Sequence, residues 1–235
     1  MKHIVKGNPP SELRRWFDGQ PAQEGRRLNC GYADMPGEVK RVVKQHLLEE
    51  QGGLCCYTGI LLSERRAHIE HFKPQSLCHN QEDVEYTNLL AAYPGDNASK
   101  CPYGAHAKAN WYDNKLLISP LHGNCENRFR FDQFGRITAA SDNDVAAKET
   151  IERLCLDHGS LTELRKQAID TVLFRKGQPL SKAQLYTITQ SFCNRNVRQQ
   201  FPMFCFVIVQ AAQALLHQAE RERKRKQAIR QRKRK

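Results

Sequence analysis

The sequence of 235 residues has no long apolar run and no apolar segment near its start. Its most apolar stretch, residues 201–216, spans sixteen residues and includes Gln210 and Gln213, so it is too short and too polar to cross a bilayer. The chain begins with charged residues where a secretory signal would have an apolar core, which favours a cytoplasmic protein with no membrane contact. Nine cysteines without an export signal are then expected to be reduced thiols.

The sequence also lacks a Cys-x-x-Cys pair, the spacing on which small zinc-binding knuckles depend. Thr58 stands three residues after Cys55, where a second cysteine would complete such a pair. Cysteines far apart in the sequence can still meet in space; the candidates are Cys55, Cys56, Cys101 and Cys125. Buried free thiols are the preferred interpretation, and a structural zinc ion is not expected.

Hydrophobic residues make up 40% of the sequence, which is typical of a folded protein, and the length suits one domain with appendages. The net charge of +12 is concentrated at one end. Residues 221–235 hold ten Lys or Arg against one Glu, a net charge of +9, which leaves only +3 for the rest of the chain. Such a tail suits a phosphate backbone, because binding releases counterions. A solvated, frayed terminus that binds acidic surfaces without specificity is the alternative. The tail residues expected to contact nucleic acid are Lys224, Arg225, Lys226, Arg232 and Lys233.

Apolar periodicity and capping patterns predict a mostly helical chain. A helix is expected from Gly37 to the pair Gly52-Gly53. Residues 54–61 are expected to form a strand and turn. Three helices follow, opened by Asp142 or Asp144 and by capping boxes at Ser160 and Ser181. The last helix is expected from about Pro202.

Residues 128–137 alternate basic and aromatic side chains and end in a turn at Gly135, which predicts a hairpin. The alternation would place Arg128 and Arg130 beside a nucleic-acid cleft. It is equally compatible with an ordinary half-buried strand whose polar face is solvated, and the sequence leaves both interpretations open.

Two histidines and a carboxylate stand within the four residues His68-Ile69-Glu70-His71. In a strand, His68 and Glu70 would share one face and His71 would lie on the other, and Pro74 would end the ladder. A carboxylate that can hold a cation beside an imidazole that can take a proton suits metal-assisted hydrolysis. A solvated strand edge is the alternative for this pattern alone.

Asn88 then precedes an apolar stretch expected to be a helical turn, and His106 and Lys108 follow. This order resembles the HNH nuclease motif, in which a two-stranded hairpin and a helix grip one metal ion (ββα-metal). The resemblance implies an α+β fold with this small core embedded in a mostly helical protein.

The same resemblance assigns roles. His71 would be the general base that deprotonates water, and Asn88 would orient it by hydrogen-bonding backbone near His71. Glu70, where the family usually has Asp, and His106 would bind one Mg²⁺ or Mn²⁺. His68 is either a third ligand or a surface histidine, and Lys108 is a candidate phosphate contact.

Further motifs are Ile118-Ser119-Pro120-Leu121, the Phe129/Phe131 pair and Gly135-Arg136-Ile137. With the residues above, they are similar to the HNH proteins of Septu anti-phage defence and retron systems, over most of residues 1–170. The likeness implies an effector nuclease, with DNA the favoured substrate, that acts with a Septu-type ABC or SMC-like ATPase. In some retron operons it implies a reverse transcriptase with its RNA–DNA hybrid. Cleavage of host tRNA and a non-catalytic nucleic-acid-binding subunit remain alternatives.

The expected organisation has four parts. Residues 1–52 form an N-terminal segment with a support helix, and residues 53–140 form the HNH core. Residues 141–220 are a helical region, and residues 221–235 are the basic tail.

Overall fold

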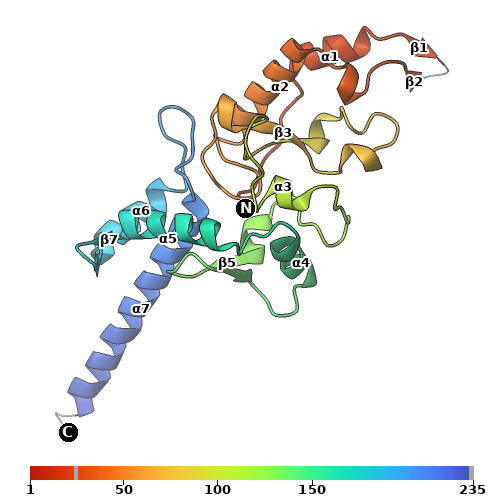
Figure 1. The fold of residues 1–235 in the computed structure, drawn as a ribbon. Coiled ribbons are helices and arrows are strands. Elements are labelled where there is room, and N and C mark those ends of the chain that lie inside the picture. Colours follow the sequence, from red (N-terminus) through yellow and green to blue (C-terminus); the bar gives the residue numbers. More distant parts are fainter. Residues whose placement is uncertain (24–25, 233–235) are drawn as a thin grey trace.

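The computed structural model describes residues 1–23 and 26–232 (Figure 1). The predicted α+β class is confirmed: within this part of the chain, seven α-helices accompany four small two-stranded antiparallel sheets. One buried apolar cluster runs through the whole fold, from Met1 to Leu216. None of the described helices combines the length and the apolar character needed to cross a membrane.

The N-terminal part consists of α1 (Ser11–Asp18), a hairpin of β1 (Ala22–Gln23) with β2 (Arg26–Arg27), and α2 (Gly37–Glu50). Helix α2 buries three apolar residues at helical spacing and packs against the strand that follows Asn88. The helix ends where it was predicted to end, because Gly52 and Gly53 have φ values of 59° and 75°.

The central hairpin pairs β3 (His68–His71) with β4 (Leu89–Ala92), in a register that sets His68 opposite Ala92 and His71 opposite Leu89. The expectation of a helical turn after Asn88 was wrong. All four residues of β4 are buried, and so short an apolar run does not distinguish a strand from a helix by periodicity. The single helical turn α3 (Ala105–Lys108) follows.

Residues 54–61 form a tight loop, and the predicted strand is reduced to one bridge between Leu54 and Leu61. The Cys55 amide donates to the Ile60 carbonyl, and the Gly59 amide donates to the Cys55 carbonyl. Gly59, with φ of 77°, lies against the first residues of the last helix. These hydrogen bonds close the backbone into a turn, so it cannot extend as a strand.

The second half is helical around two further hairpins. The predicted hairpin exists as β5 (Phe129–Phe131) with β6 (Ile137–Ala139), and β7 (Phe174–Arg175) pairs with β8 (Gln178–Pro179). Helix α4 (Val145–Arg153) is capped by Asp144, and α6 (Lys182–Ser191) has the predicted capping box at Ser181. Helix α5 (Gly159–Leu173) differs, because His158 caps it and the expected box at Ser160 is absent.

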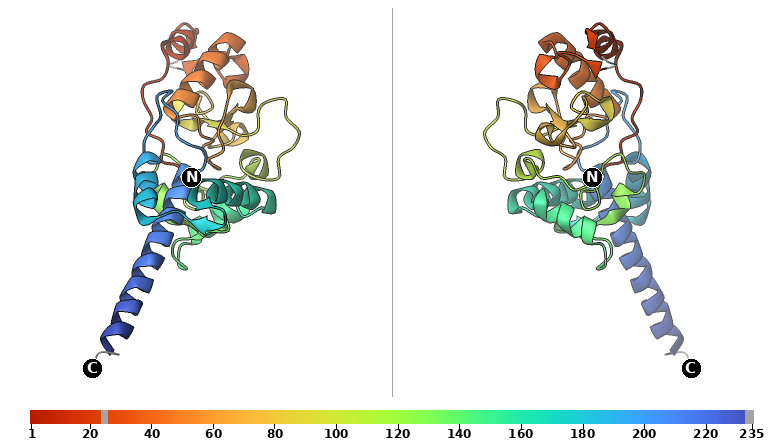
Figure 2. Two further views of the ribbon diagram at one scale, coloured as in Figure 1. Left: turned by 90° about the vertical axis from the view of Figure 1, so that its left-hand side faces the viewer. Right: turned by 90° about the vertical axis from the view of Figure 1, so that its right-hand side faces the viewer.

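The last helix, α7 (Cys205–Arg232), starts three residues later than predicted. Its first turns are buried against α5, α6 and β5, whereas its second half extends away from the body into solvent (Figure 2). The basic tail is therefore the end of a helix, on which Lys224, Arg225 and Lys226 are exposed. Arg232 is the last residue of the helix, and Lys233 lies outside the described residues.

Candidate active site

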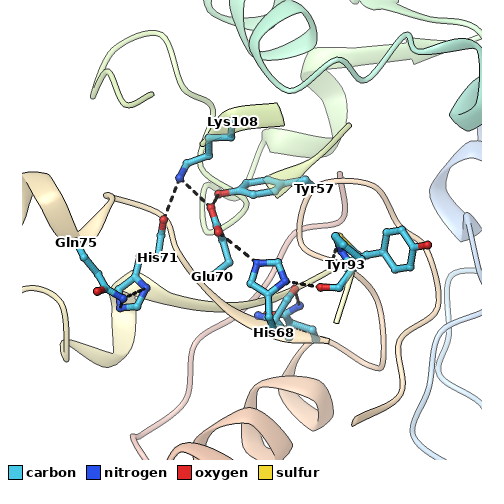
Figure 3. A network of polar contacts seen from close by, with 11 residues as sticks. Tyr57, His68, Glu70, His71, Gln75, Tyr93 and Lys108 are labelled. Carbon is cyan, nitrogen blue, oxygen red and sulfur yellow. Dashed lines mark hydrogen bonds and ion pairs between the residues drawn. The ribbon is translucent and has the colours of Figure 1, made fainter. Parts of the chain in front are cut away.

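The hairpin β3–β4 and the turn α3 bring four of the predicted site residues into one region: His68, Glu70, His71 and Lys108 (Figure 3). The Lys108 ammonium from α3 donates to Glu70 Oε1 at 2.8 Å and to the His71 carbonyl at 3.0 Å, which ties α3 to β3. Glu70 also accepts from the Tyr57 hydroxyl at 3.1 Å and lies 3.5 Å from His68 Nε2. A strand, a loop and a helical turn thus converge on one carboxylate.

The His71 ring is held in one tautomer. Its Nε2 lies 2.9 Å from the Asp83 carbonyl, which can only accept, so Nε2 carries the proton and Nδ1 is the unprotonated nitrogen. The exposed Gln75 amide approaches Nδ1 at 3.2 Å. Burial lowers the pKa of His71, which is only 7% exposed, so the ring is neutral at pH 7. A neutral ring with one unprotonated nitrogen can act as a base.

Asn88 hydrogen-bonds backbone beside His71, as the prediction required. Its Oδ1 accepts from the Lys73 amide at 2.7 Å, and its Nδ2 donates to the Lys73 carbonyl at 3.1 Å and the Glu82 carbonyl at 3.0 Å. Its own carbonyl accepts from the Phe72 amide at 2.9 Å. Asn88 therefore holds two segments of the loop between β3 and β4, at Lys73 and at Glu82. Lys73 is two residues after His71.

His68 shares the face of Glu70, as the strand alternation predicted. Its Nδ1 donates to the Pro94 carbonyl, so its Nε2 is the atom directed at Glu70 Oε2 (Figure 3). Burial lowers the pKa of His68, but hydrogen bonds to Glu70 and Pro94 outweigh burial and raise it above its ordinary value. For Glu70 burial acts in the opposite direction and raises the pKa. The hydrogen bonds and charges of His68 and Lys108 outweigh burial, so the pKa of Glu70 lies below its ordinary value.

These donors fit a divalent cation in part. Glu70 Oε2 and His68 Nε2 face one another. The other ring nitrogen of His68 donates to a backbone carbonyl, as is typical of metal-binding histidines. The His106 ring lies 5.8 Å from the His68 ring, but its Nδ1 accepts from the Cys101 amide at 3.0 Å. A neutral His106 then carries its proton on Nε2. Over the described residues, no group of three or more His, Cys, Asp or Glu side chains is arranged to hold a metal ion.

The candidate zinc cysteines lie in the interior of the protein. Cys55, Cys56, Cys101 and Cys125 are buried free thiols. Cys55 accepts from the Tyr93 amide at 3.3 Å.

The predicted nucleic-acid contacts have different environments. Lys108 is 2% exposed with its ammonium on Glu70, so it is a buried ion-pair partner and does not reach the surface where a phosphate would lie. Arg128 forms a two-pronged ion pair with Asp144, the cap of α4, which matches the half-buried alternative. Arg130 is exposed, and its Nε donates to the Ala140 carbonyl at 3.4 Å.

Three contributors were missed by sequence reasoning. Tyr57 donates to Glu70, and the Tyr32 ring meets His71 edge-on with centroids 4.5 Å apart. The carboxylate of Asp83 accepts from the Tyr32 amide at 2.7 Å while its carbonyl holds His71. Tyr32 and Asp83 are 51 residues apart in sequence, and no local pattern connects them.

Comparison with known proteins gives one informative relationship. No family model matches the chain. The chain is 28% identical over 183 residues to a protein of Vibrio cholerae serotype O1 biovar El Tor named "Retron Vc95 putative HNH endonuclease". The match covers 74% of this chain and 85% of that protein. The chain is thus a distant relative of a retron-associated protein named for HNH endonuclease activity, and that name mentions neither Septu nor an ATPase.

Proposed function

We propose that the chain is a metal-dependent HNH endonuclease that hydrolyses phosphodiester bonds of nucleic acid, as the effector of a retron-type anti-phage defence system. The observation that carries the proposal is the neutral His71 ring, in which Nδ1 is the unprotonated nitrogen. The distant relationship to the Vc95 retron protein supports the same activity. We assign the nuclease core to residues 53–140.

In this proposal His71 Nδ1 takes a proton from the attacking water after the exposed Gln75 amide moves aside. The Asp83 carbonyl keeps the His71 ring in the reactive tautomer, because a proton on Nδ1 in place of Nε2 would leave this buried carbonyl without its donor. Asn88 and Tyr32 are positioning residues, since they hold the backbone and the ring of His71.

Glu70 Oε2 and His68 Nε2 would hold the divalent cation, Mg²⁺ or Mn²⁺. His106 would join them only after its ring releases the Cys101 amide. When bound, the cation stabilises negative charge on the leaving oxygen. Imidazole ligands favour Mn²⁺ over Mg²⁺, which prefers oxygen. Binding requires His68 to give up its proton on Nε2, so affinity for the cation falls at acidic pH.

DNA is the favoured substrate because a cation and a base suffice for hydrolysis without a 2′-hydroxyl. RNA such as host tRNA is the alternative substrate. We also propose, from the sequence resemblance, an ABC or SMC-like ATPase partner of the Septu type and a retron reverse transcriptase with its RNA–DNA hybrid.

A non-catalytic nucleic-acid-binding subunit is the second candidate function. It is favoured by one observation: the Glu70 carboxylate is already paired with the buried Lys108 ammonium. In that case the exposed basic residues of α7 would carry the function.

The test incubates wild type and His71→Ala, with and without the co-purified partners, with labelled plasmid DNA and total tRNA in Mg²⁺, Mn²⁺ or EDTA. The proposal expects cleavage that requires both the cation and His71, and the nucleic acid that is degraded identifies the substrate. Nucleic-acid binding without cleavage under all these conditions would select the non-catalytic function.

A further inference from the structure

A groove of about 870 Å³ opens between β5 and α7, on a part of the molecule that the proposed active site does not use. One wall is the edge of β5, and the other is a single face of α7 that presents Gln210, Gln213, His217 and Arg221. Gln210 joins the walls, because its Oε1 accepts from the Phe131 amide and its Nε2 donates to the Phe129 carbonyl, both at 3.1 Å. The edge of β5 is therefore occupied by a side-chain amide at this point.

The lining of the groove is basic and rich in amides. Its ten residues include Arg130, Arg221 and His217, four Asn or Gln side chains, and no carboxylate. Arg128 and Arg136, on either side of Arg130 in sequence, are paired with aspartates, so their charges are compensated. Arg130 contacts a backbone carbonyl, so its charge remains available to a ligand.

The groove continues into the projecting half of α7. Residues 221–232 contain seven Lys or Arg and one Glu, a net charge of +6, on a helix that leaves the body of the protein (Figure 2). Arg221 and Arg225 are one helical turn apart, and like charges at this spacing destabilise a helix. A polyanion bound along this face would remove that repulsion.

We propose that the groove and the basic turns of α7 form one binding site for the backbone of a nucleic-acid duplex, separate from the site of hydrolysis. Phosphate oxygens are acceptors that arginine and side-chain amides recognise. Phe129 and Phe131 are 1% and 7% exposed, so the groove offers no ring face on which unpaired bases could stack. Recognition is therefore of the backbone and independent of sequence. The inference rests on the proposed function only in taking nucleic acid as the ligand class.

The test measures fluorescence anisotropy of a labelled DNA duplex with the full-length protein in EDTA, over a range of salt concentrations. The double variant Gln213→Glu/His217→Glu puts two carboxylates on the exposed α7 wall. It should weaken binding about tenfold or more and reduce the slope of log K against log salt by about one to two. Gln213→Lys should tighten binding. Thr187→Glu/Gln190→Glu also introduces two carboxylates, on the exposed surface of α6 outside the groove, and should have no effect.

The outcomes separate this inference from the proposed function. If wild type cleaves through His71 while the double variant binds the duplex with unchanged affinity and salt slope, the groove is not the site and the nuclease proposal stands. Tighter binding of a single strand than of the duplex, or equal competition by polyglutamate of matched charge, would also overturn the inference. The second result would identify an acidic protein surface as the ligand.

Discussion

The buried ion pair between Lys108 and Glu70 gives a quantitative prediction. Lys108→Met keeps most of the side-chain volume and removes the charge, so Glu70 loses its ammonium partner and the His71 carbonyl loses a donor. Removing one partner of a buried ion pair costs about 3–5 kcal/mol. Glu70 keeps the Tyr57 hydroxyl and His68, so we expect the lower end, about 3 kcal/mol.

The assay is urea unfolding at pH 7, with thermal unfolding as a second measure. For a chain of this size, about 3 kcal/mol corresponds to a fall in Tm of roughly 6–12 °C. Glu70→Gln/Lys108→Met removes both charges and should recover part of the loss, because no uncompensated charge remains. A Lys108→Met protein whose free energy of unfolding lies within about 0.5 kcal/mol of the wild-type value would show that this ion pair is not buried. If that protein also lost cleavage, Lys108 would be a surface phosphate contact, as the sequence suggested.

Three further predictions concern the supports of the site and of the fold. Asn88→Ala removes a side chain with three backbone hydrogen bonds and should cost about 2–3 kcal/mol in urea unfolding. Gly59→Ala should lower the stability more than Gly177→Ala. Both residues have positive φ, but only at Gly59 would the new Cβ meet a carbon of the Phe206 ring, at 2.6 Å. Equal Tm values for the two variants would contradict this packing. The Arg128 guanidinium holds the pKa of Asp144 below its usual range, so this pair stabilises the fold above the unfolded pKa of about 3.9 and the stabilisation is lost as pH falls through the lower folded value. Asp144→Asn should therefore be less stable than wild type at pH 7, with a difference that shrinks in unfolding curves recorded at more acidic pH.

The parts of the site that follow from local sequence were predictable. The strand His68–His71 and its alternation depend on residues close to one another in sequence. The backbone hydrogen bonds of Asn88 were expected from the resemblance to the HNH motif, because their partner Lys73 is 15 residues away. The helix α2 and its glycine stop were predicted for the same reason, because apolar spacing and backbone conformation are local properties.

The rest depends on contacts between distant segments. In the sequence, nothing distinguishes Lys108 from a surface lysine, and only the packing of α3 onto β3 shows that it is buried on a carboxylate 38 residues away. Tyr32 and Asp83 support His71 through a contact across 51 residues. The turn at 54–61, mistaken for a strand, has distant partners besides its local hydrogen bonds: the Gly59 carbonyl accepts from the Phe204 amide at 3.0 Å, and Gly59 lies against Phe206.

The most direct test of the account asks whether the His71 imidazole is the base. His71→Gly, assayed with the partners and the cation that support wild-type cleavage, should be inactive, and added imidazole should restore cleavage in proportion to its neutral form. Imidazole should not restore cleavage by Glu70→Gly, because that variant lacks a carboxylate and keeps the His71 imidazole. Cleavage by His71→Gly at the wild-type rate without imidazole would contradict the central claim.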